Sequence, residues 1–400
     1  APSVEARPPS ASPAPSPSNG PATTGYTLGI AYEGSEDEAR GPGYQERKAV
    51  VTAALKEAEE RTGRDLPVLP VNAGETDDAD EADLDADAAA TLLKRHPGML
   101  AVLGETDALD DSTGLSADLA MVDTCEGGGE VMGTFAVSAP LSEVGEQEGR
   151  YLRAEGVDTV LVGSDYDGGE GARDDTELGR ALRAGGVKAV PSETEPDLMD
   201  ASDVRRDTRA KKADAVTLPE GSMRTWIDAL KGPEGPRLLV QDGYAAGCVR
   251  TGSPGDSEEE QKGLPEGSLR FRAFHDPSQK PDCASFPKLC PAPGSSPDDE
   301  LRVLLKDRNA AELYDATLAV GQALARVLPE GPAPAAARER VRKELADVEV
   351  KGLLGTYDFD GHQARERPVW VDRRTGGKWQ QLGTVTGFLG TGTGTGTGKD

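Results

Sequence analysis

The chain has 400 residues, of which 36% are hydrophobic, and its formal net charge at pH 7 is −27. This length is enough for one large hydrophobic core or two ordinary ones. No apolar run is long enough to span a bilayer. The acidic excess disfavours long-range attraction to nucleic acid or to an anionic membrane surface, and it also fits a merely well-solvated surface.

Both ends of the chain have a low-complexity composition. Residues 1–24 are mostly Ala, Pro and Ser, so we expect a disordered, flexible tether. A tether of this kind without an initiating Met indicates a processed, exported protein or a trimmed chain, and any lipid or helical anchor would lie outside this sequence. Residues 384–400 contain a Thr/Gly repeat, and we expect a disordered tail there as well.

From Tyr26 onward, short apolar segments alternate with segments of helical spacing. Helices between short apolar strands imply right-handed crossovers and parallel sheets. About nine strands are too many for one small lobe, and the pattern breaks near residue 140, so we predict two doubly wound α/β lobes with a cleft between them. The predicted strands are 26–32, 66–71, 99–103, 131–137, 159–163, 187–190, 215–218 and 238–241, and the predicted helices are 44–62, 84–95, 142–154, 173–185, 201–212 and 221–231.

The order of elements changes after Ser268. Residues 269–274 are strand-like, and apolar residues at helical spacing predict a long helix from about Asp298 to Leu328, followed by a helix at 333–345. In the last part of the chain, Val369 and Val371 flank Trp370, with Gly and Asp nearby, which is typical of a half-buried hairpin.

The four cysteines indicate at least one disulfide. Cys283 and Cys290 bracket a short loop within the Pro-rich Cys loop 276–297, where a covalent link would replace missing core contacts. We expect no metal site there, because no nearby Cys or His completes a set of four ligands. Cys125 and Cys248 remain as a possible second pair, although four cysteines allow three connectivities.

The sequence offers no catalytic motif. Its three histidines are scattered, and no Gly-x-Ser-x-Gly nucleophile elbow occurs. We therefore expect a protein that is not an enzyme and that needs no cofactor.

Several segments, taken in order, resemble one known family. They are Asp158-Thr-Val-Leu-Val-Gly-Ser-Asp-Tyr-Asp-Gly-Gly-Glu-Gly, Gly185-Gly-Val-Lys-Ala-Val, Ala213-Asp-Ala-Val-Thr-Leu and the terminal Gly355-Thr-Tyr-Asp-Phe-Asp. From Tyr26 to about Gly383 the chain is similar to the type I periplasmic solute-binding proteins, which include receptors for branched-chain amino acids and amides. Residues 104–130 fit this pattern poorly.

The resemblance implies two Rossmann-like lobes joined by a multi-strand hinge. In this family the late long helix returns to the first lobe, so both lobes are discontinuous. The expected N-terminal lobe is 25–140, completed by about 298–345, and the expected C-terminal lobe is 141–275, completed by about 350–383.

The resemblance also implies ligand-binding residues at the carboxyl ends of the strands. Small residues, hydroxyls and backbone amides there would hold a ligand carboxylate, an aromatic ring would cover the ligand, and acids across the cleft would meet its ammonium group. A tyrosine stacked on the first turn of the following helix, and acids that are simply solvated, are the alternatives. The expected residues are Thr106, Ser138 and Ala139 for the carboxylate, Tyr166 for the cover, and Glu220, Asp242 and Tyr244 across the cleft.

The function implied is non-catalytic. A family member would be an extracytoplasmic, membrane-anchored lipoprotein made with a signal segment. It would close like a Venus flytrap on a small polar solute, such as an amino acid or an amide, and would deliver it to an ABC-type permease. It would have no nucleic-acid partner. The alternatives are the ligand-sensing ectodomain of a membrane receptor and a scaffold of the same fold that binds nothing.

Overall fold

The computed structural model describes most of the segment between Gly25 and Gly390. The described ranges are 25–31, 42–73, 92–104, 119–124, 134–163, 176–192, 200–219, 223–232, 234–242, 261, 263–279, 283–290, 305 and 309–390. The expected tether, the tail beyond 390, Thr106, Cys125, Tyr166, Glu220, Tyr244 and Cys248 lie outside these ranges, and of Asp242 only the backbone is described. Within the described ranges, no helix combines the length and apolarity needed to cross a bilayer.

The first lobe is built on a seven-stranded sheet in the order β13-β14-β5-β4-β3-β1-β2. The strands from β1 to β5 run parallel, and all six residues of β3 are buried, as expected for a parallel strand with both faces covered. The bounds are β1 (Tyr26–Ile30), β2 (Val68–Asn72), β3 (Met99–Gly104), β4 (Ala120–Asp123), β5 (Thr134–Ala136), β13 (Phe359–Asp360) and β14 (Gln363–Ala364).

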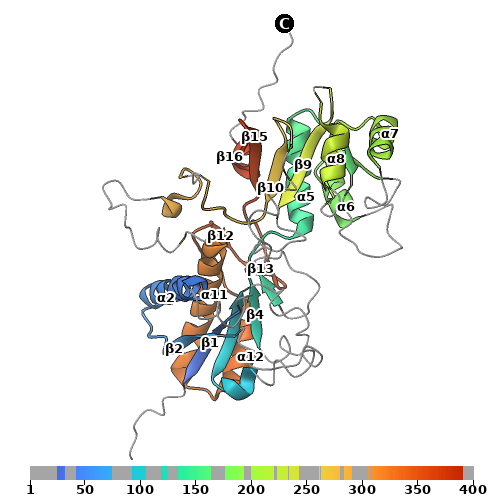
Figure 1. The fold of residues 1–400 in the computed structure, drawn as a ribbon. Helices are drawn as coiled ribbons and strands as arrows, with labels where there is room; N and C mark the ends of the chain where they lie inside the picture. The colour runs from blue at the N-terminus through green and yellow to red at the C-terminus, as the bar shows by residue number, and fades with distance from the viewer. Residues whose placement is uncertain are drawn as a thin grey trace, which may run out of the picture.

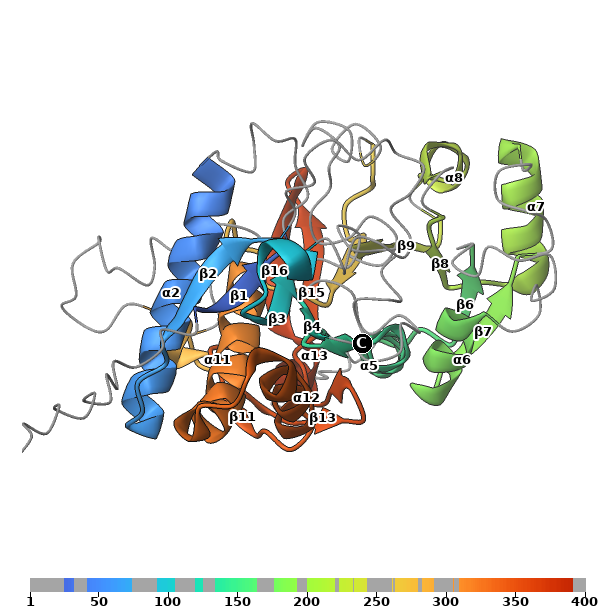
Figure 2. The same ribbon diagram turned by 90° about the horizontal axis from the view of Figure 1, so that it is seen from below.

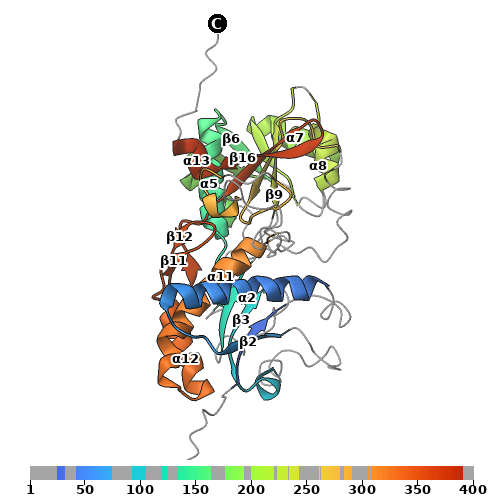
Figure 3. The same cartoon turned by 90° about the vertical axis from the view of Figure 1, so that its left-hand side faces the viewer.

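Helices α2 (Pro42–Thr62), α11 (Ala310–Val327) and α12 (Pro334–Leu345) complete this lobe. Helix α11 is buried along almost its whole length and belongs to the main core of the lobe. It packs against α2, which lies across it in Figure 3. The contact is close, because a Cβ atom added at Gly321 of α11 would lie 2.6 Å from the Cβ of Ala58 on α2. The 3-10 turn η4 (Leu328–Glu330) links α11 to α12, and the short strands β11 (Val350–Lys351) and β12 (Thr356–Tyr357) form a separate pair.

The second lobe repeats this design with a seven-stranded sheet in the order β16-β15-β10-β9-β8-β6-β7. Helices α5, α6 and α13 share one hydrophobic cluster with the sheet, and α7 and α8 share another. The strands are β6 (Thr159–Val162), β7 (Lys188–Pro191), β8 (Ala215–Thr217), β9 (Arg237–Asp242), β10 (Leu269–Arg272), β15 (Trp370–Thr375) and β16 (Lys378–Thr384), and the helices are α5 (Leu141–Ala154), α6 (Glu177–Ala184), α7 (Ala201–Lys211), α8 (Met223–Leu230) and α13 (Val385–Gly390).

The five parallel strands of each lobe have the same order, 2-1-3-4-5. The chain passes between the lobes three times, from β5 to α5, from β10 to α11 and from β14 to β15. Each of the first two passages leaves the carboxyl end of a strand, so the carboxyl edges of both sheets face the junction between the lobes. Figure 1 shows the two lobes one above the other, with these passages between them. The predicted architecture of two doubly wound α/β lobes with a multi-strand hinge is confirmed.

The terminal hairpin is also confirmed. Strands β15 and β16 pair antiparallel, and the turn between them contains Gly376 and Gly377 at φ 59° and 72°. Two successive residues with positive φ are the requirement of a tight hairpin turn, which glycine meets without strain. The predicted disulfide between Cys283 and Cys290 is present, with their Cα atoms 5.6 Å apart, and it encloses the 3-10 turn η3 (Pro287–Leu289).

The structure corrects several predicted boundaries. Strand β4 had no counterpart in the sequence prediction. The long helix begins at Ala310 rather than near 298, because Asn309 adopts a left-handed conformation at φ 52° that a continuing α-helix does not allow.

Two further boundaries differ near the end of the chain. Residues 350–364 were assigned to the second lobe, but β13 and β14 add to the first sheet, and the second sheet resumes only at Trp370. Residues 385–390 were assigned to a disordered tail, but they form α13, in which Val385 is buried against the second lobe.

Candidate functional site

In an open α/β sheet, ligands bind outside the carboxyl ends of the strands, at the point where the strand order reverses. In the first lobe this point lies between β1 and β3. The N–H of Ala31, after β1, donates to the carbonyl of Leu103 at 2.7 Å. Gly104 follows at φ +146°, and a Cβ atom there would lie 2.4 Å from the carbonyl oxygen of Ala31. Only glycine fits this position, so backbone groups of both strands lie close together at the reversal point.

Beside this point, Ser138 and two residues that the sequence prediction missed form a buried polar cluster. The hydroxyl of Ser138 donates to the carbonyl of Thr124 at 3.1 Å, and the amide of Asn309 donates to the hydroxyl of Thr124 at 3.4 Å. The side chain of Gln363 donates to the carbonyl of Ser138 at 2.7 Å. All but Gln363 are essentially inaccessible to solvent. The cluster therefore joins the ends of β4 and β5 to the start of α11.

Ser138 and Ala139, the two small residues expected to hold a ligand carboxylate, have different surroundings. Ser138 uses its hydroxyl proton within the cluster, on the passage between the lobes. Ala139 is fully buried in the hydrophobic cluster of the second lobe. Thr124 and Asn309 are 185 positions apart, so no local sequence pattern could have paired them.

The second lobe has a matching reversal point between β6 and β8. The N–H of Gly163 donates to the hydroxyl of Thr217 at 3.0 Å. A Cβ atom at Gly163 would lie 2.7 Å from the carbonyl of Thr217 and 2.8 Å from the ring of Trp226. Asp242 ends β9 beside Arg272 of β10, so its backbone reaches the same edge of the sheet. Each lobe thus presents a glycine and a buried threonine at its carboxyl edge.

A buried carboxyl group lies where the second passage reaches the first lobe. The backbone N–H of His275 donates to Oε1 of Glu312 at 2.7 Å, whereas Oε2 of Glu312 is buried and has no hydrogen-bond partner within the described residues. Burial raises the pKa of Glu312 to about 7, against the opposing effects of this hydrogen bond and of the charge on Arg367. Burial also lowers the pKa of His275 to about 4.

Buried ion pairs fix the ends of the passages. Asp372 accepts from Nε of Arg270 at 2.7 Å and from Nε of Arg272 at 2.8 Å. Burial alone would raise the pKa of Asp372, but the two guanidinium charges outweigh it and the pKa is lowered. In the first lobe, both terminal nitrogens of Arg367 lie 3.2 Å from one oxygen of Asp315.

The chemical groups at this junction are suited to binding a small polar molecule. The described part of the chain holds no group of His, Cys, Asp and Glu side chains that could bind a metal ion. The junction offers hydroxyls, backbone amides and the amino ends of helices that follow parallel strands. Such helix ends favour anionic groups.

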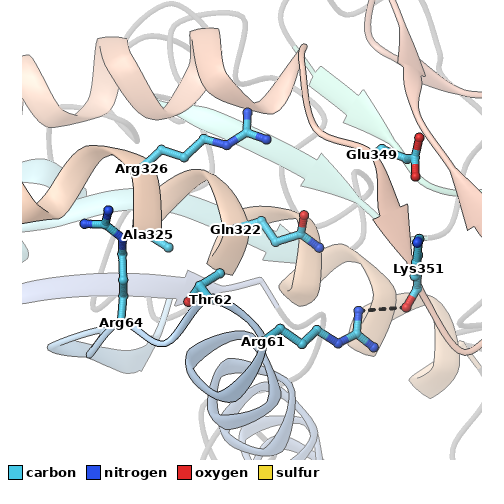
Figure 4. Close-up of a pocket in the computed structure, with 8 residues that line it drawn as sticks. All are labelled: Arg61, Thr62, Arg64, Gln322, Ala325, Arg326, Glu349 and Lys351. Atoms are coloured by element: carbon cyan, nitrogen blue, oxygen red, sulfur yellow. Dashed lines mark hydrogen bonds between the residues drawn. The ribbon is translucent and has the colours of Figure 1, made fainter.

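A groove on the first lobe, with a volume of about 450 Å³, lies elsewhere (Figure 4). It lies between the last turns of α2 and α11 and strand β11, and none of its residues comes from the carboxyl end of a parallel strand. Two of its cations have partners nearby: Arg61 donates to the carbonyl of Lys351 at 2.8 Å and pairs with Glu57, and Arg326 pairs with Glu344 at 3.2 Å. The residues that line it are Arg61, Thr62, Arg64, Gln322, Ala325, Arg326, Glu349 and Lys351.

Neither a protein-family model nor a curated protein matches the sequence. Solved structures do match. An ABC transporter substrate-binding protein from Desulfitobacterium hafniense superposes with a TM-score of 0.58 at 17% identity, over 89% of this chain and 99% of that protein. A leucine-binding protein from Thermotoga maritima gives 0.55 at 17%, over 90% and 97%. A putative branched-chain amino acid ABC transporter protein from Rhodospirillum rubrum gives 0.59 at 15%, over 89% and 99%. The chain therefore has the fold of the type I periplasmic solute-binding proteins.

Proposed function

We propose that this chain is the extracytoplasmic solute-binding protein of an ABC-type transporter. Its two lobes close on a small polar solute that carries a carboxylate, such as an amino acid or an amide derivative. The proposal rests on one observation: both sheets have the same strand order, and their carboxyl edges, with their reversal points, face one junction. In such sheets this edge is where ligands bind.

The ligands named for similar proteins support the solute class. One structure from Desulfitobacterium hafniense is described in complex with Leu, and one from Rhodopseudomonas palustris in complex with benzoate, at TM-scores of 0.56 and 0.51. Both ligands are small carboxylates. At the identities of 16% and 13%, these structures support a class of solute for this chain and no particular solute.

We assign the solute contacts to the residues expected from the sequence. Thr106, with the passage at Ser138 and Ala139, serves the carboxylate at the edge of the first lobe. Tyr166 covers the solute, and Glu220, Asp242 and Tyr244 serve its amino group from the second lobe. A membrane permease is the partner that would receive the solute, and a tether at the cell surface would keep the protein near it.

A thermal-shift screen of the whole chain against amino acids, amides, aromatic acids, sugars and nucleosides tests this function. A solute present at a hundred times its dissociation constant stabilises the folded state by about 2.7 kcal/mol, which should raise the melting temperature by roughly 3 °C in a chain of this length. We expect such a rise from at least one carboxylate-bearing solute. If no solute raises the melting temperature, and Tyr166→Ala leaves the melting curve unchanged as well, the proposed function is wrong.

Variants identify where the solute binds. Asp242→Asn should weaken the binding of a solute with an amino group by about tenfold or more in calorimetry, because the ammonium would lose its charged partner. Asp347→Asn changes an exposed carboxylate after α12 and should leave the affinity unchanged. Equal affinities for all three proteins would place the solute outside this junction.

A further inference from the structure

Helix α7 of the second lobe carries a dense group of cations. Between Arg205 and Lys212, five of the eight residues are Arg or Lys, in a chain whose net charge is −27. Arg205, Arg206, Arg209 and Lys212 are exposed. We call the set Arg205, Arg206, Arg209, Lys211 and Lys212 the α7 cations.

Three of the five α7 cations are not paired within the described part of the chain. Arg206 pairs with Asp203 one turn earlier. Arg205, Arg209 and Lys212 form no ion pair with any other described residue. The helix dipole favours cations in the last turn of α7, but it gives no such reason for Arg205 in the middle of the helix. Arg205, Arg209 and Lys212 are therefore available to an external anionic partner.

Three of the α7 cations border a groove of about 650 Å³. Arg205, Arg209 and Lys212 line it from α7, and Lys231 lines it from the end of α8. Ala213, Leu230 and Pro236 add apolar surface. A ligand in this groove would meet positive charge from two elements and an apolar surface between them.

The groove keeps an excess of positive charge, because four cations and only two acids line it. Oδ2 of Asp214 accepts the backbone N–H groups of Asp158 and Thr159, at 3.0 and 2.9 Å, so that carboxylate is already hydrogen-bonded at the start of β6. Glu234 lies on the exposed loop before β9. Lys231 pairs with Asp228, outside the groove lining, at 2.6 Å.

The groove lies far from the junction between the lobes. Residues 212–214 and 232–236 immediately precede β8 and β9, so the groove is at the amino ends of these strands, whereas the junction is at the carboxyl ends. Figure 2 shows α7 at the outer edge of the second lobe. A partner bound here would leave solute entry and lobe closure unobstructed.

We propose that this groove, with Arg205, Arg209 and Lys212 along its rim, binds a short acidic polypeptide segment of a partner protein. Charge complementarity selects an anion, and the groove with its apolar lining selects a narrow chain over a flat surface. An extended anionic membrane would also face the repulsion of the whole acidic molecule. A short peptide responds mainly to charges within the screening distance of about 10 Å at 0.1 M salt.

The test is fluorescence anisotropy of the whole chain with a labelled twelve-residue peptide of alternating Glu and Asp around a central Leu. We expect binding that weakens as salt is raised from 50 to 300 mM. The variant Arg205→Glu/Arg209→Glu/Lys212→Glu should bind at least tenfold more weakly, because three cations that face the peptide are reversed.

A matched variant separates the groove from overall charge. Arg64→Glu/Lys343→Glu/Lys378→Glu makes the same change in net charge at exposed positions on other elements and should keep the wild-type affinity. Both variants change exposed residues, so circular dichroism and thermal melting should match the wild type. An equal loss of affinity in both variants, or no peptide binding by the wild type, would overturn the proposal.

Two other partners give different results. Sedimentation with vesicles containing phosphatidylglycerol would show binding that needs the α7 cations if a membrane were the partner. Sedimentation velocity would show a dimer that dissociates in the α7 variant if a second copy were the partner. Either result, without peptide binding, would contradict an acidic segment as the occupant.

Discussion

The carboxyl group of Glu312 is an ionisable group at the junction between the lobes, and its pKa is raised to about 7. It is fully buried in the first turn of α11 and accepts the N–H of His275 from the passage that arrives from the second lobe. Arg367, on the third passage, and Asp315, one turn further along α11, are the charges that act on it. Its protonation is therefore linked to the segments that join the lobes.

Glu312→Gln should change how stability depends on pH. Burial raises the pKa of Glu312 from its ordinary 4.5 to about 7, so the folded state binds this proton more tightly than the unfolded chain does. The stabilisation from this group is complete below pH 4.5 and is lost as pH rises through 7, a change on the order of 3 kcal/mol. Glutamine does not titrate, so the free energy of unfolding of the wild type minus that of Glu312→Gln should fall by this amount between pH 4.5 and pH 8.

Urea unfolding at several pH values measures this difference. The lowered pKa of His275 has the opposite effect on stability between pH 4 and 6.5, but it is present in both proteins and cancels. Glu339→Gln, at an exposed position on α12, is the control and should follow the wild type at every pH. A difference between wild type and Glu312→Gln that stays constant with pH would contradict the assigned role of burial.

At the scale of single residues, the sequence predicted where Ser138 lies along the chain but not which residues it contacts. Ser138 was expected at the carboxyl end of a strand, and it lies just after β5. Its hydrogen bond to Thr124 depends on β4, and the link from Thr124 to Asn309 depends on the return of α11 to the first lobe. Contacts between residues so far apart in sequence come from the tertiary fold, which leaves no local pattern.

Strands and helices were more predictable than single contacts. Most elements follow a clear apolar pattern, such as the continuous apolar run of β3, in which all six residues are buried. Strand β4 was missed because only four residues form it, in a stretch with no clear repeat. The start of α11 was misplaced because apolar residues continue upstream, whereas the break depends on the backbone conformation of Asn309.

The disulfide between Cys283 and Cys290 should stabilise its loop by restricting the unfolded chain. Phe286, inside this loop, is buried in the core of the first lobe, and its ring centroid lies 6.0 Å from that of Trp370. Replacing both cysteines by serine should lower the free energy of unfolding by about 2 kcal/mol, since the closed loop is short.

Urea unfolding under oxidising conditions measures this loss. Ala284→Ser introduces a polar hydroxyl into the same loop, keeps the disulfide and should unfold at the wild-type midpoint. If the double serine variant unfolded at the wild-type midpoint too, the loop would not depend on its disulfide.

At the scale of the whole molecule, the repeated strand order and the three passages determine how the lobes would move in the proposed function. The first two passages connect the carboxyl edges of the sheets, so rotation about them opens or closes the space where the reversal points lie. Hinge motion of this kind needs changes in only a few backbone angles. The sequence resemblance predicted this plan, but in the structure the last passage ends at Trp370, where β15 begins.

The distance between the lobes, measured with and without solute, tests the central claim most directly. Pulsed electron paramagnetic resonance measures this distance between two spin labels. The labels are attached at Lys56→Cys on α2 and Ala210→Cys on α7, in a chain in which Cys125 and Cys248 are replaced by serine. Pools of amino acids, amides and small aromatic acids remove the need to know the solute. We expect at least one pool to shift the distribution to a shorter mean distance in the wild-type site and not in Asp242→Asn. An unchanged distribution with every pool would contradict closure of the lobes on a small carboxylate solute.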